Sequence, residues 1–311
     1  MKAWQVIGAK KPLTLNEVNP PTAGPGQVVI NVKAAGICHT DVSYLDGTLT
    51  HYVGELPLTL GHEIAGTIDS LGEGVTGFSV GQRVVATADV DGPGTRTHGG
   101  FASQVLVPAE LLVPLPDEVS FEQGATATDA GMTSMHALNL GEVRKGTKVG
   151  IIGAGGLGSL AIQFALGMGA EVYVAEINEN IHDNIRKYGN VEVATSITEF
   201  ADKDLEVIVD YAGFGTTTAE AIETVGMGGT VIQVGLAREQ ANISAQSVVL
   251  KKLRYLGSLG GTPEDVANVI SLMAEGKVKS DVNTVSFNQI GDTVEKLARG
   301  ETTGRSVALI D

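Results

Sequence analysis

Residues 148–176 read KVGIIGAGGLGSLAIQFALGMGAEVYVAE, and this stretch decides the fold of the chain around it. A short apolar run over 149–152 is followed by glycines in the order G-x-G-x-x-G and by an apolar segment with helical spacing over 157–168. A second β-rich run, 172–175, ends in Glu176. The order strand, glycine-rich turn, helix, strand and acid predicts a dinucleotide-binding βαβ unit.

Each glycine of the turn has a physical role. Gly153 lets the chain turn off the strand, Gly155 leaves space for a pyrophosphate, and Gly158 lets the helix pack closely on the sheet. The free N–H groups and the positive dipole end at the helix N-terminus favour phosphate. The cofactor contacts expected in this turn are Gly153, Ala154, Gly155, Gly156, Leu157 and Gly158.

Glu176 indicates which dinucleotide binds. It lies at the distance from the last glycine where a carboxylate accepts hydrogen bonds from both ribose hydroxyls. A carboxylate there repels a 2′-phosphate, and the next residues, 177–179, include no cation to hold one. The sequence therefore predicts NAD rather than NADP. The alternative for the uncharged stretch 149–170 is a transmembrane helix, but its interrupting glycines and the near absence of basic flanks argue against this.

The composition sets the broad class of the protein. A chain of 311 residues is long enough for two domains, and 43% hydrophobic with 18% charged residues excludes general disorder. The net charge of −15 argues against a nucleic-acid partner. Cys38 is the only cysteine, so no disulfide forms within the chain, and no signal-peptide pattern opens it. We expect a cytoplasmic protein without a membrane partner.

The two halves of the chain have different patterns. Residues 1 to about 125 show short strands separated by turn residues, which is typical of a small barrel; the clearest strands are 28–32, 63–69, 83–86 and 101–108. From Lys148 strands and helices alternate, which predicts an α/β fold with a doubly wound parallel sheet.

Further elements flank this core. Residues 121–140 have a helical pattern, and 179–188 is a shorter helix of the alternating region. Val234 and Gly235 follow a strand of the parallel sheet, and ligands of such sheets lie at the carboxyl ends of the strands. A helix over 263–276 is expected to begin at an N-cap, Thr262.

Three residues of the first half are candidate metal ligands. The thiolate of Cys38, the imidazole of His62 and the carboxylate of Asp129 are all good zinc ligands, and three protein ligands with an open position form a catalytic zinc site. Taken singly, each has a plainer interpretation: a buried apolar cysteine, a hydrogen-bonded surface histidine, and an N-cap at Asp129.

Five segments together carry a resemblance to a known family. They are GICHTD at 36–41, LGHEIAGTI at 60–68, GGFA at 99–102, DAGMTSMHAL at 129–138 and GAGGLG at 153–158. In this order and spacing they closely resemble the zinc-dependent medium-chain alcohol dehydrogenases, over nearly the whole chain. The resemblance implies a barrel-like, GroES-like catalytic domain over 1–132 and 261–311. It also implies a Rossmann domain for the dinucleotide over 133–260.

The resemblance also implies roles at the metal. Cys38 and His62 match the first two zinc ligands, and Asp129 falls where many members have cysteine and some have aspartate. Glu63 matches a glutamate beside the metal that can swing onto it, and Asp41 matches the carboxylate that orients the zinc-ligating histidine.

Other positions are implied to contact the substrate or the cofactor. Thr40 matches the hydroxyl that takes the alcohol's proton. His39 and Arg305 match contacts to the cofactor pyrophosphate, and Thr133 matches one near the nicotinamide. Ser43 stands where some members end the proton relay in a histidine.

The chain departs from many members in a second respect. The region 86–99, where a lobe with four cysteines would bind a structural zinc, is short and has no cysteine. We therefore expect one catalytic zinc and no structural zinc.

The resemblance implies hydride transfer between NAD and a small, secondary alcohol or ketone. The substrate pocket is expected to draw on Tyr44, Leu45 and the loops 51–58 and 87–98. Members of the family commonly pair through an edge strand of the cofactor domain, so the resemblance implies a homodimer or homotetramer. Residues 254–258 are the candidate edge strand, and the alternative is that they form an ordinary internal strand. The sequence leaves three alternatives: a polyol dehydrogenase, a dinucleotide-binding redox sensor without turnover, and a zinc-free reductase. The presence of all three candidate ligands argues against the last.

Overall fold

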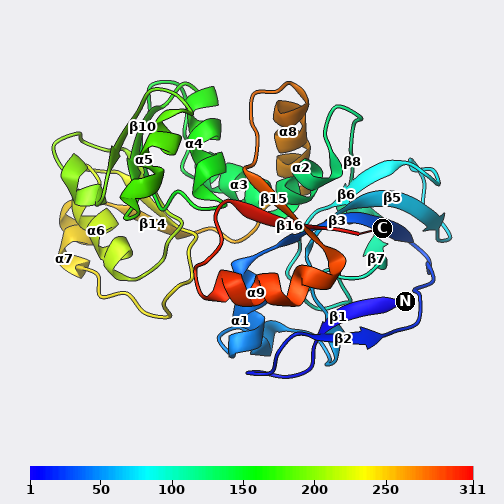
Figure 1. The fold of residues 1–311 in the computed structure, drawn as a ribbon. Coiled ribbons are helices and arrows are strands. Elements are labelled where there is room, and N and C mark those ends of the chain that lie inside the picture. The colour runs from blue at the N-terminus through cyan, green and yellow to red at the C-terminus, as the bar shows by residue number, and fades with distance from the viewer. Residues whose placement is uncertain (311) are drawn as a thin grey trace. The chain divides into compact units, whose positions relative to one another are not determined.

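A computed structural model describes residues 1–310 and divides them into two compact units, whose elements are labelled in Figure 1. The split unit combines residues 1–132 with residues from 262 onward, and the inserted unit comprises residues 133–261. Among the described residues, no helix combines the length and apolar character needed to cross a bilayer.

The inserted unit is built on a six-stranded parallel sheet. The strand order β11-β10-β9-β12-β13-β14 runs outward in both directions from β9 and β12, which is the order of the Rossmann fold. Four of the five residues of β9 are buried, as expected for a central strand covered on both faces. The strands are β9 Lys148–Ile152, β10 Glu171–Ala175, β11 Val191–Ala194, β12 Val207–Asp210, β13 Thr230–Gln233 and β14 Arg254–Gly257.

Helices alternate with these strands, which confirms the predicted doubly wound α/β sheet. The helix predicted over 157–168 is α4, whereas the one predicted over 179–188 is two short pieces, η4 and α5. The first piece is a 3₁₀ turn capped by Asn178, whose side chain accepts from Asn180 N at 3.2 Å. The helices are α3 Met132–Leu140, α4 Gly158–Gly167, η4 Glu179–Ile181, α5 His182–Arg186, η5 Ile197–Phe200, α6 Thr216–Thr224 and α7 Ala245–Leu250.

The split unit contains a seven-stranded sheet and a three-stranded sheet, ordered β15-β16-β3-β5-β6-β8 (with β7 paired to β3) and β2-β1-β4. The long strand β3 pairs with β16, β5 and β7, and its pairing with β5 shifts register twice, which bends the sheet. The apolar faces of these strands form one core. The strands are β1 Lys2–Val6, β2 Thr14–Glu17, β3 Gln27–Ile37, β4 Leu58–Thr59, β5 Glu63–Leu71, β6 Arg83–Ala86, β7 Gln104–Pro108, β8 Leu112–Pro114, β15 Val282–Ser286 and β16 Arg305–Leu309.

The helices of the split unit differ from expectation at one functional position. Instead of one helix over 121–140, α2 passes into a π-helical turn, η3, which holds Asp129. Asp129 is thus interior to a helical run, and its alternative interpretation as an N-cap is wrong. The helices are α1 His39–Asp46, η1 Thr50–Tyr52, η2 Ala109–Leu111, α2 Phe121–Thr126, η3 Ala127–Gly131, α8 Pro263–Ala274, η6 Phe287–Gln289 and α9 Ile290–Ala298.

Two other local predictions have different outcomes. Thr262 is confirmed as the N-cap of α8, because its hydroxyl accepts from Asp265 N at 3.2 Å. The strand predicted from Phe101 begins only at Gln104, because the backbone of Phe101 bonds to Leu60 and Trp4 instead.

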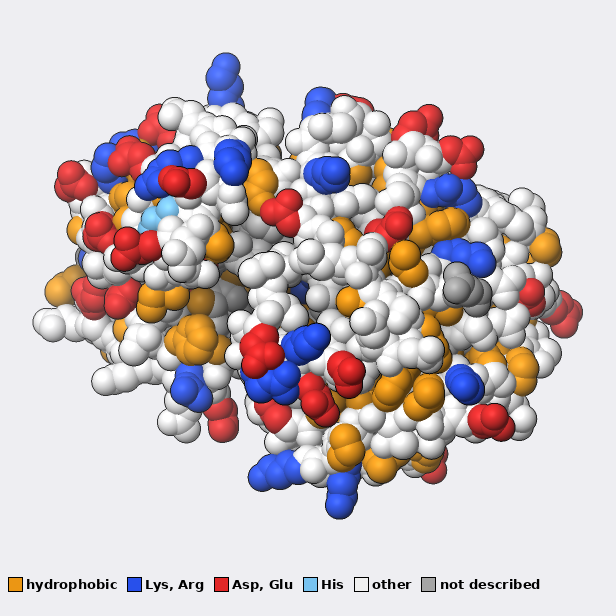
Figure 2. All heavy atoms as spheres, viewed as in Figure 1, with side chains coloured by type: hydrophobic (Ala, Val, Ile, Leu, Met, Phe, Trp, Pro, Cys, Tyr) orange, Lys and Arg blue, Asp and Glu red, His pale blue; other side chains and the backbone are white. Residues whose placement is uncertain are grey.

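On the surface, Figure 2 shows acidic and basic side chains interspersed over the face that it draws.

Candidate functional site

The glycine-rich turn between β9 and α4 has the geometry that phosphate binding needs. Gly153 has a φ of +84°, which allows the sharp turn. A Cβ at Gly158 would lie 1.8 Å from the carbonyl oxygen of Gly153, whereas a Cβ at Gly155 would meet nothing within 4 Å. The turn is therefore closed toward the helix and open at Gly155, where an anion can reach the backbone.

Glu176 lies at this same turn. Its Oε2 accepts from Ala154 N and its Oε1 accepts from Asn178 N, both at 2.8 Å. These two bonds hold the carboxylate beside the turn. The inserted unit thus brings together the glycine-rich turn and the acid, which the sequence predicts to bind pyrophosphate and ribose.

Val234 and Gly235 begin the loop after β13, at the same edge of the parallel sheet as the turn. Their N–H groups donate to the carbonyl oxygen of Asp210, at 3.0 and 2.9 Å. Thr133, the remaining expected contact of the inserted unit, is a buried residue of α3.

Four donor side chains converge within the split unit. One ligand atom each from Cys38, His62, Glu63 and Asp129 lies within 4.8 Å of the others. The Cys38 Sγ lies 3.3 Å from Asp129 Oδ2, and His62 Nε2 lies 3.5 Å from the same oxygen. The three predicted metal ligands, which are far apart in the sequence, are therefore neighbours.

Local structure positions each of them. Cys38 stands between β3 and α1, where it is the N-cap residue of the helix. His62 precedes β5, a strand paired with β3 next to Cys38. Asp129 is carried by the π-helical turn, a feature that often occurs at functional sites because it displaces a helical side chain.

Asp41 connects two of the ligands. Its Oδ2 accepts from the backbone N of Cys38 at 2.9 Å, and its Oδ1 lies 3.6 Å from His62 Nδ1. Asp41 is completely buried. The carboxylate therefore faces the ring nitrogen that does not point at Asp129, which is the arrangement that orients a metal-binding histidine.

Arg305 approaches the cluster from β16. Its guanidinium forms an ion pair with Glu63, with Nε 3.2 Å from Oε2, and its Nη2 lies 3.2 Å from Asp129 Oδ2. A Cβ at Gly36 would lie 2.0 Å from Glu63 Oε2, so a glycine is required beside this pair. Arg305, which the resemblance assigns to the pyrophosphate, is 6% exposed and contacts two acidic residues of the cluster.

The donor set and its spacing fit zinc. In a tetrahedral zinc site, sulfur, nitrogen and oxygen ligands lie about 3.4 to 3.6 Å from one another, given metal–ligand distances near 2.0 to 2.3 Å. The Cys38–Asp129 and His62–Asp129 distances match this spacing. Burial lowers the pKa of His62, but the Asp41 charge and hydrogen bonds with Asp129, Asp41 and Cys38 raise it well above its ordinary value. The groups that contact His62 thus stabilise a positive charge at the position of its ring.

The residues expected around the substrate lie on α1 and the loops beside it. Thr40 Oγ1 lies 3.5 Å from Cys38 Sγ, which places this hydroxyl next to a candidate ligand. His39 is exposed on the first turn of α1, and Ser43 is half-buried on the same helix. The buried Tyr44 hydroxyl donates to Thr95 Oγ1 at 3.3 Å, which joins α1 to the short loop 87–98.

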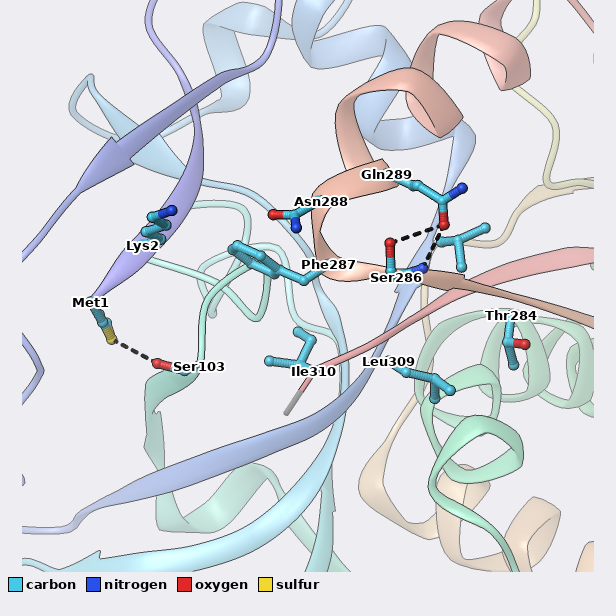
Figure 3. A pocket seen from close by; sticks show the side chains of 11 residues that line it. Met1, Lys2, Ser103, Thr284, Ser286, Phe287, Asn288, Gln289, Leu309 and Ile310 are labelled. Carbon is cyan, nitrogen blue, oxygen red and sulfur yellow. Dashed lines mark hydrogen bonds between the residues drawn. The ribbon is translucent and has the colours of Figure 1, made fainter.

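A separate cavity of about 660 Å³ lies elsewhere in the split unit (Figure 3). None of the cluster residues lines it, so it is distinct from the candidate metal centre. Its lining residues are Met1, Lys2, Ser103, Thr284, Val285, Ser286, Phe287, Asn288, Gln289, Leu309 and Ile310.

Two contacts of the site were not anticipated from the sequence. One is the pairing of Arg305 with Glu63 and Asp129, although a lone arginine opening the apolar run 307–310 is a signal that a charge is buried and needs a partner. The other is Asp210, which joins the ends of β12 and β13. Asp210 directly precedes the turn residues 211–213 in the sequence, but the apolar pattern of a single strand does not show its bonds to the neighbouring strand.

Comparisons with known proteins agree with this fold. Residues 24–117 match the alcohol dehydrogenase GroES-like domain, and residues 156–275 match the zinc-binding dehydrogenase family. An alcohol dehydrogenase from Geobacillus stearothermophilus is 31% identical over 338 aligned positions, which cover 100% of both chains. An alcohol dehydrogenase from a Moraxella species is 30% identical, with 99% of this chain and 98% of that one covered.

Solved structures are similar over the same extent. The acetophenone reductase from Geotrichum candidum in complex with NAD is 30% identical with a TM-score of 0.91, covering 99% of this chain and 97% of that one. The alcohol dehydrogenase of the archaeon Aeropyrum pernix is 26% identical, also with a TM-score of 0.91, covering 100% of both.

Fold, site and relatives define an alcohol-oxidising oxidoreductase with a GroES-like domain and a Rossmann domain. The chain belongs to the zinc-dependent medium-chain alcohol dehydrogenase family. It is accordingly an alcohol dehydrogenase that uses a nicotinamide dinucleotide.

Proposed function

We propose that the chain transfers hydride between NAD(H) and a small secondary alcohol or its ketone, with one catalytic zinc held by Cys38, His62 and Asp129. The observation that carries the proposal is the convergence of these three ligand atoms, with Glu63, within 4.8 Å. In this assignment residues 1–132 and 261–311 form the catalytic domain, and residues 133–260 form the dinucleotide-binding domain.

The residues around the metal centre have distinct tasks in this proposal. Bound there, zinc would polarise the substrate oxygen as a Lewis acid, and NAD would accept the hydride. Thr40, next to Cys38, relays the proton of the alcohol hydroxyl: it accepts that proton while its own hydroxyl proton passes on to the cofactor ribose and solvent. Asp41 keeps the His62 ring in its ligand orientation. Arg305 neutralises Glu63 and holds it beside the cluster.

The cofactor residues bind the dinucleotide in two parts. Gly153 to Gly158 receive the pyrophosphate on the open side of the turn, and Glu176 accepts from the ribose hydroxyls. His39 and Arg305 are proposed as further pyrophosphate contacts, Thr133 as a contact near the nicotinamide. The solved complex of the related acetophenone reductase with NAD supports NAD as the cofactor.

The substrate class rests on relatives and on the metal ligands. The name acetophenone reductase designates a ketone substrate, whose reduction gives a secondary alcohol. A polyol dehydrogenase is the second candidate, because the third ligand is Asp129 rather than a cysteine. A (2R,3R)-butanediol dehydrogenase from Bacillus subtilis, 25% identical with a TM-score of 0.88, also favours it.

Assays of primary, secondary and cyclic alcohols and of vicinal diols, each with NAD and with NADP, test this function. The proposal expects the highest kcat/KM for a secondary alcohol with NAD. A preference for diols would favour the polyol dehydrogenase, and NADH binding without turnover of any substrate would make the chain a redox sensor.

Assembly and location follow from two features of the chain. The edge strand β14 leaves Tyr255 40% exposed, and Val249, Leu250 and Leu259 nearby in sequence are also exposed, so we propose that two copies pair through this edge. Sedimentation velocity should show a dimer or a tetramer of such dimers. The single cysteine, Cys38, forms no disulfide, which suits the reducing cytoplasm, the proposed location.

A further inference from the structure

Asp210 is a buried carboxylate for which the proposed reaction has no use. It is the last residue of β12 and is 0% exposed. Its Oδ1 accepts from the backbone N–H groups of Ala212 and Gly213, at 3.0 and 2.8 Å. Its Oδ2 accepts from the hydroxyls of Thr217 and Thr218, both at 2.9 Å. Four donors satisfy a buried carboxylate, so this side chain fixes the turn after β12 and the start of α6.

The main chain of Asp210 also fixes the loop after the neighbouring strand. Its carbonyl oxygen accepts from Val234 N at 3.0 Å and from Gly235 N at 2.9 Å. One residue therefore bonds to both loops, 211–215 through its side chain and 234–240 through its backbone.

The two loops touch directly at a pair of glycines. A Cβ at Gly213 would lie 2.1 Å from Gly235 O, and a Cβ at Gly235 would lie 2.4 Å from the carbonyl carbon of Ala212. Arg238 N donates to Gly213 O at 3.0 Å. At these glycines the two backbones are in direct contact, with no side chain between them. The two loops therefore form one continuous surface.

A second side chain joins the same network. Gln233 Nε2 donates to Gly235 O at 2.7 Å, and Gln233 Oε1 lies 2.9 Å from the Thr218 hydroxyl. The Thr218 hydroxyl is thus placed between the Asp210 carboxylate and the Gln233 amide. The network spans β12, β13 and α6, so a change at Asp210 affects both loops.

The position of this surface indicates its ligand. It lies at the carboxyl ends of β12 and β13, on the side of the switch point opposite to β10, which carries Glu176 at its end. A Rossmann sheet binds one nucleotide on each side of that point. The loops expose Phe214 at 54% and Leu236 at 61%, and apolar side chains of this kind suit a planar aromatic ring.

We propose that Asp210 is a positioning residue that locks the loops 211–215 and 234–240 into a preformed surface for the nicotinamide half of the dinucleotide. This inference rests on the proposed dinucleotide function of the inserted unit. Preforming the surface removes the cost of ordering two loops on binding. The glycine-rich turn and Glu176 are proposed to hold the adenosine half, and none of the four bonds of the Asp210 carboxylate reaches them, although Ala212 lies beside Gly153.

Calorimetric titration of the full chain with NADH and, separately, with AMP tests the proposal. Asp210→Asn keeps the shape of the side chain but cannot accept from all four donors. It should weaken NADH binding by about tenfold or more while AMP affinity stays within about twofold. Thr217→Val removes one donor to the Asp210 carboxylate and also the acceptor of Phe214 N, and it should weaken NADH binding by about threefold, again with AMP unchanged. Thr216→Val, at an exposed position of the same helix, is the matched control.

Each outcome has one meaning. Equal losses of NADH and AMP affinity, or no loss for NADH in either variant, would overturn the positioning role. If Asp210→Asn does not fold, the Thr217→Val titration decides alone. If the wild-type chain binds neither NADH nor AMP, the proposed dinucleotide function itself fails.

Discussion

Replacing Glu176 with glutamine should relax the choice between NAD and NADP. The change removes one negative charge at the end of β10 and retains an amide oxygen that can still accept from Ala154 N, where the carboxylate Oε2 now accepts at 2.8 Å. A dinucleotide seated on this turn places its adenosine ribose at the carboxylate, so a 2′-phosphate would bring its charge to within about 4 Å of Glu176.

The magnitude follows from the charge and its surroundings. Two unit charges 4 Å apart interact by about 1 kcal/mol in water and by about 4 kcal/mol near a protein surface. Glu176 is half-buried, and the phosphate carries more than one charge, so the repulsion is about 2 to 4 kcal/mol. Since about 1.4 kcal/mol is a factor of ten, the ratio of NADP to NAD affinity should rise by about 30- to 1000-fold.

Fluorescence titration of the variant with NADH and NADPH measures this ratio. Glu179→Gln, an exposed acid three residues further along, is the matched control and should leave the ratio unchanged. A wild-type protein that already prefers NADPH, or an equal change in both affinities, would refute the assignment of Glu176 to the ribose.

Three further changes test separate parts of the account. Asp129→Asn should lower zinc affinity by about 100-fold or more in competition with a chelator, while Asp129→Cys should retain the metal; equal affinity of both variants and wild type would remove Asp129 from the ligand set. Thr40→Val should reduce kcat by about 10²- to 10⁴-fold with unchanged NADH affinity, and a normal kcat would show that the proton leaves by another route. Thr262→Ala should lower the free energy of unfolding in urea by about 1 kcal/mol through loss of the α8 N-cap, with zinc content unaffected; an unchanged stability would contradict the capping role.

Local sequence signals were sufficient for much of the fold. The turn between β9 and α4, the alternation of strands and helices after Lys148, and the N-cap at Thr262 each depend on residues close together in the chain. The break in the helix 121–140 could not be read in this way, because a π-helical turn changes hydrogen-bond register without requiring a distinctive residue.

The metal centre, too, is only partly predictable from the sequence. The residue types of Cys38, His62 and Asp129 indicate metal ligands, and the family resemblance places the three in one site. Their spacing in the sequence does not by itself show that they are neighbours. Arg305 is 242 residues from Glu63, and only the pairing of β16 with β3 and of β3 with β5 brings the two side chains together. Contacts of this kind depend on sheet order, which the apolar pattern of single strands does not specify.

We expect that zinc bound by Cys38, His62 and Asp129 is required for alcohol oxidation. Elemental analysis of the purified chain and of Cys38→Ser, combined with turnover before and after removal of metal by a chelator, tests it most directly. We expect one zinc per wild-type chain, almost none in the variant, and activity that is lost with the metal and restored by adding zinc. A zinc-free protein that still oxidises its alcohol at the full rate would contradict it.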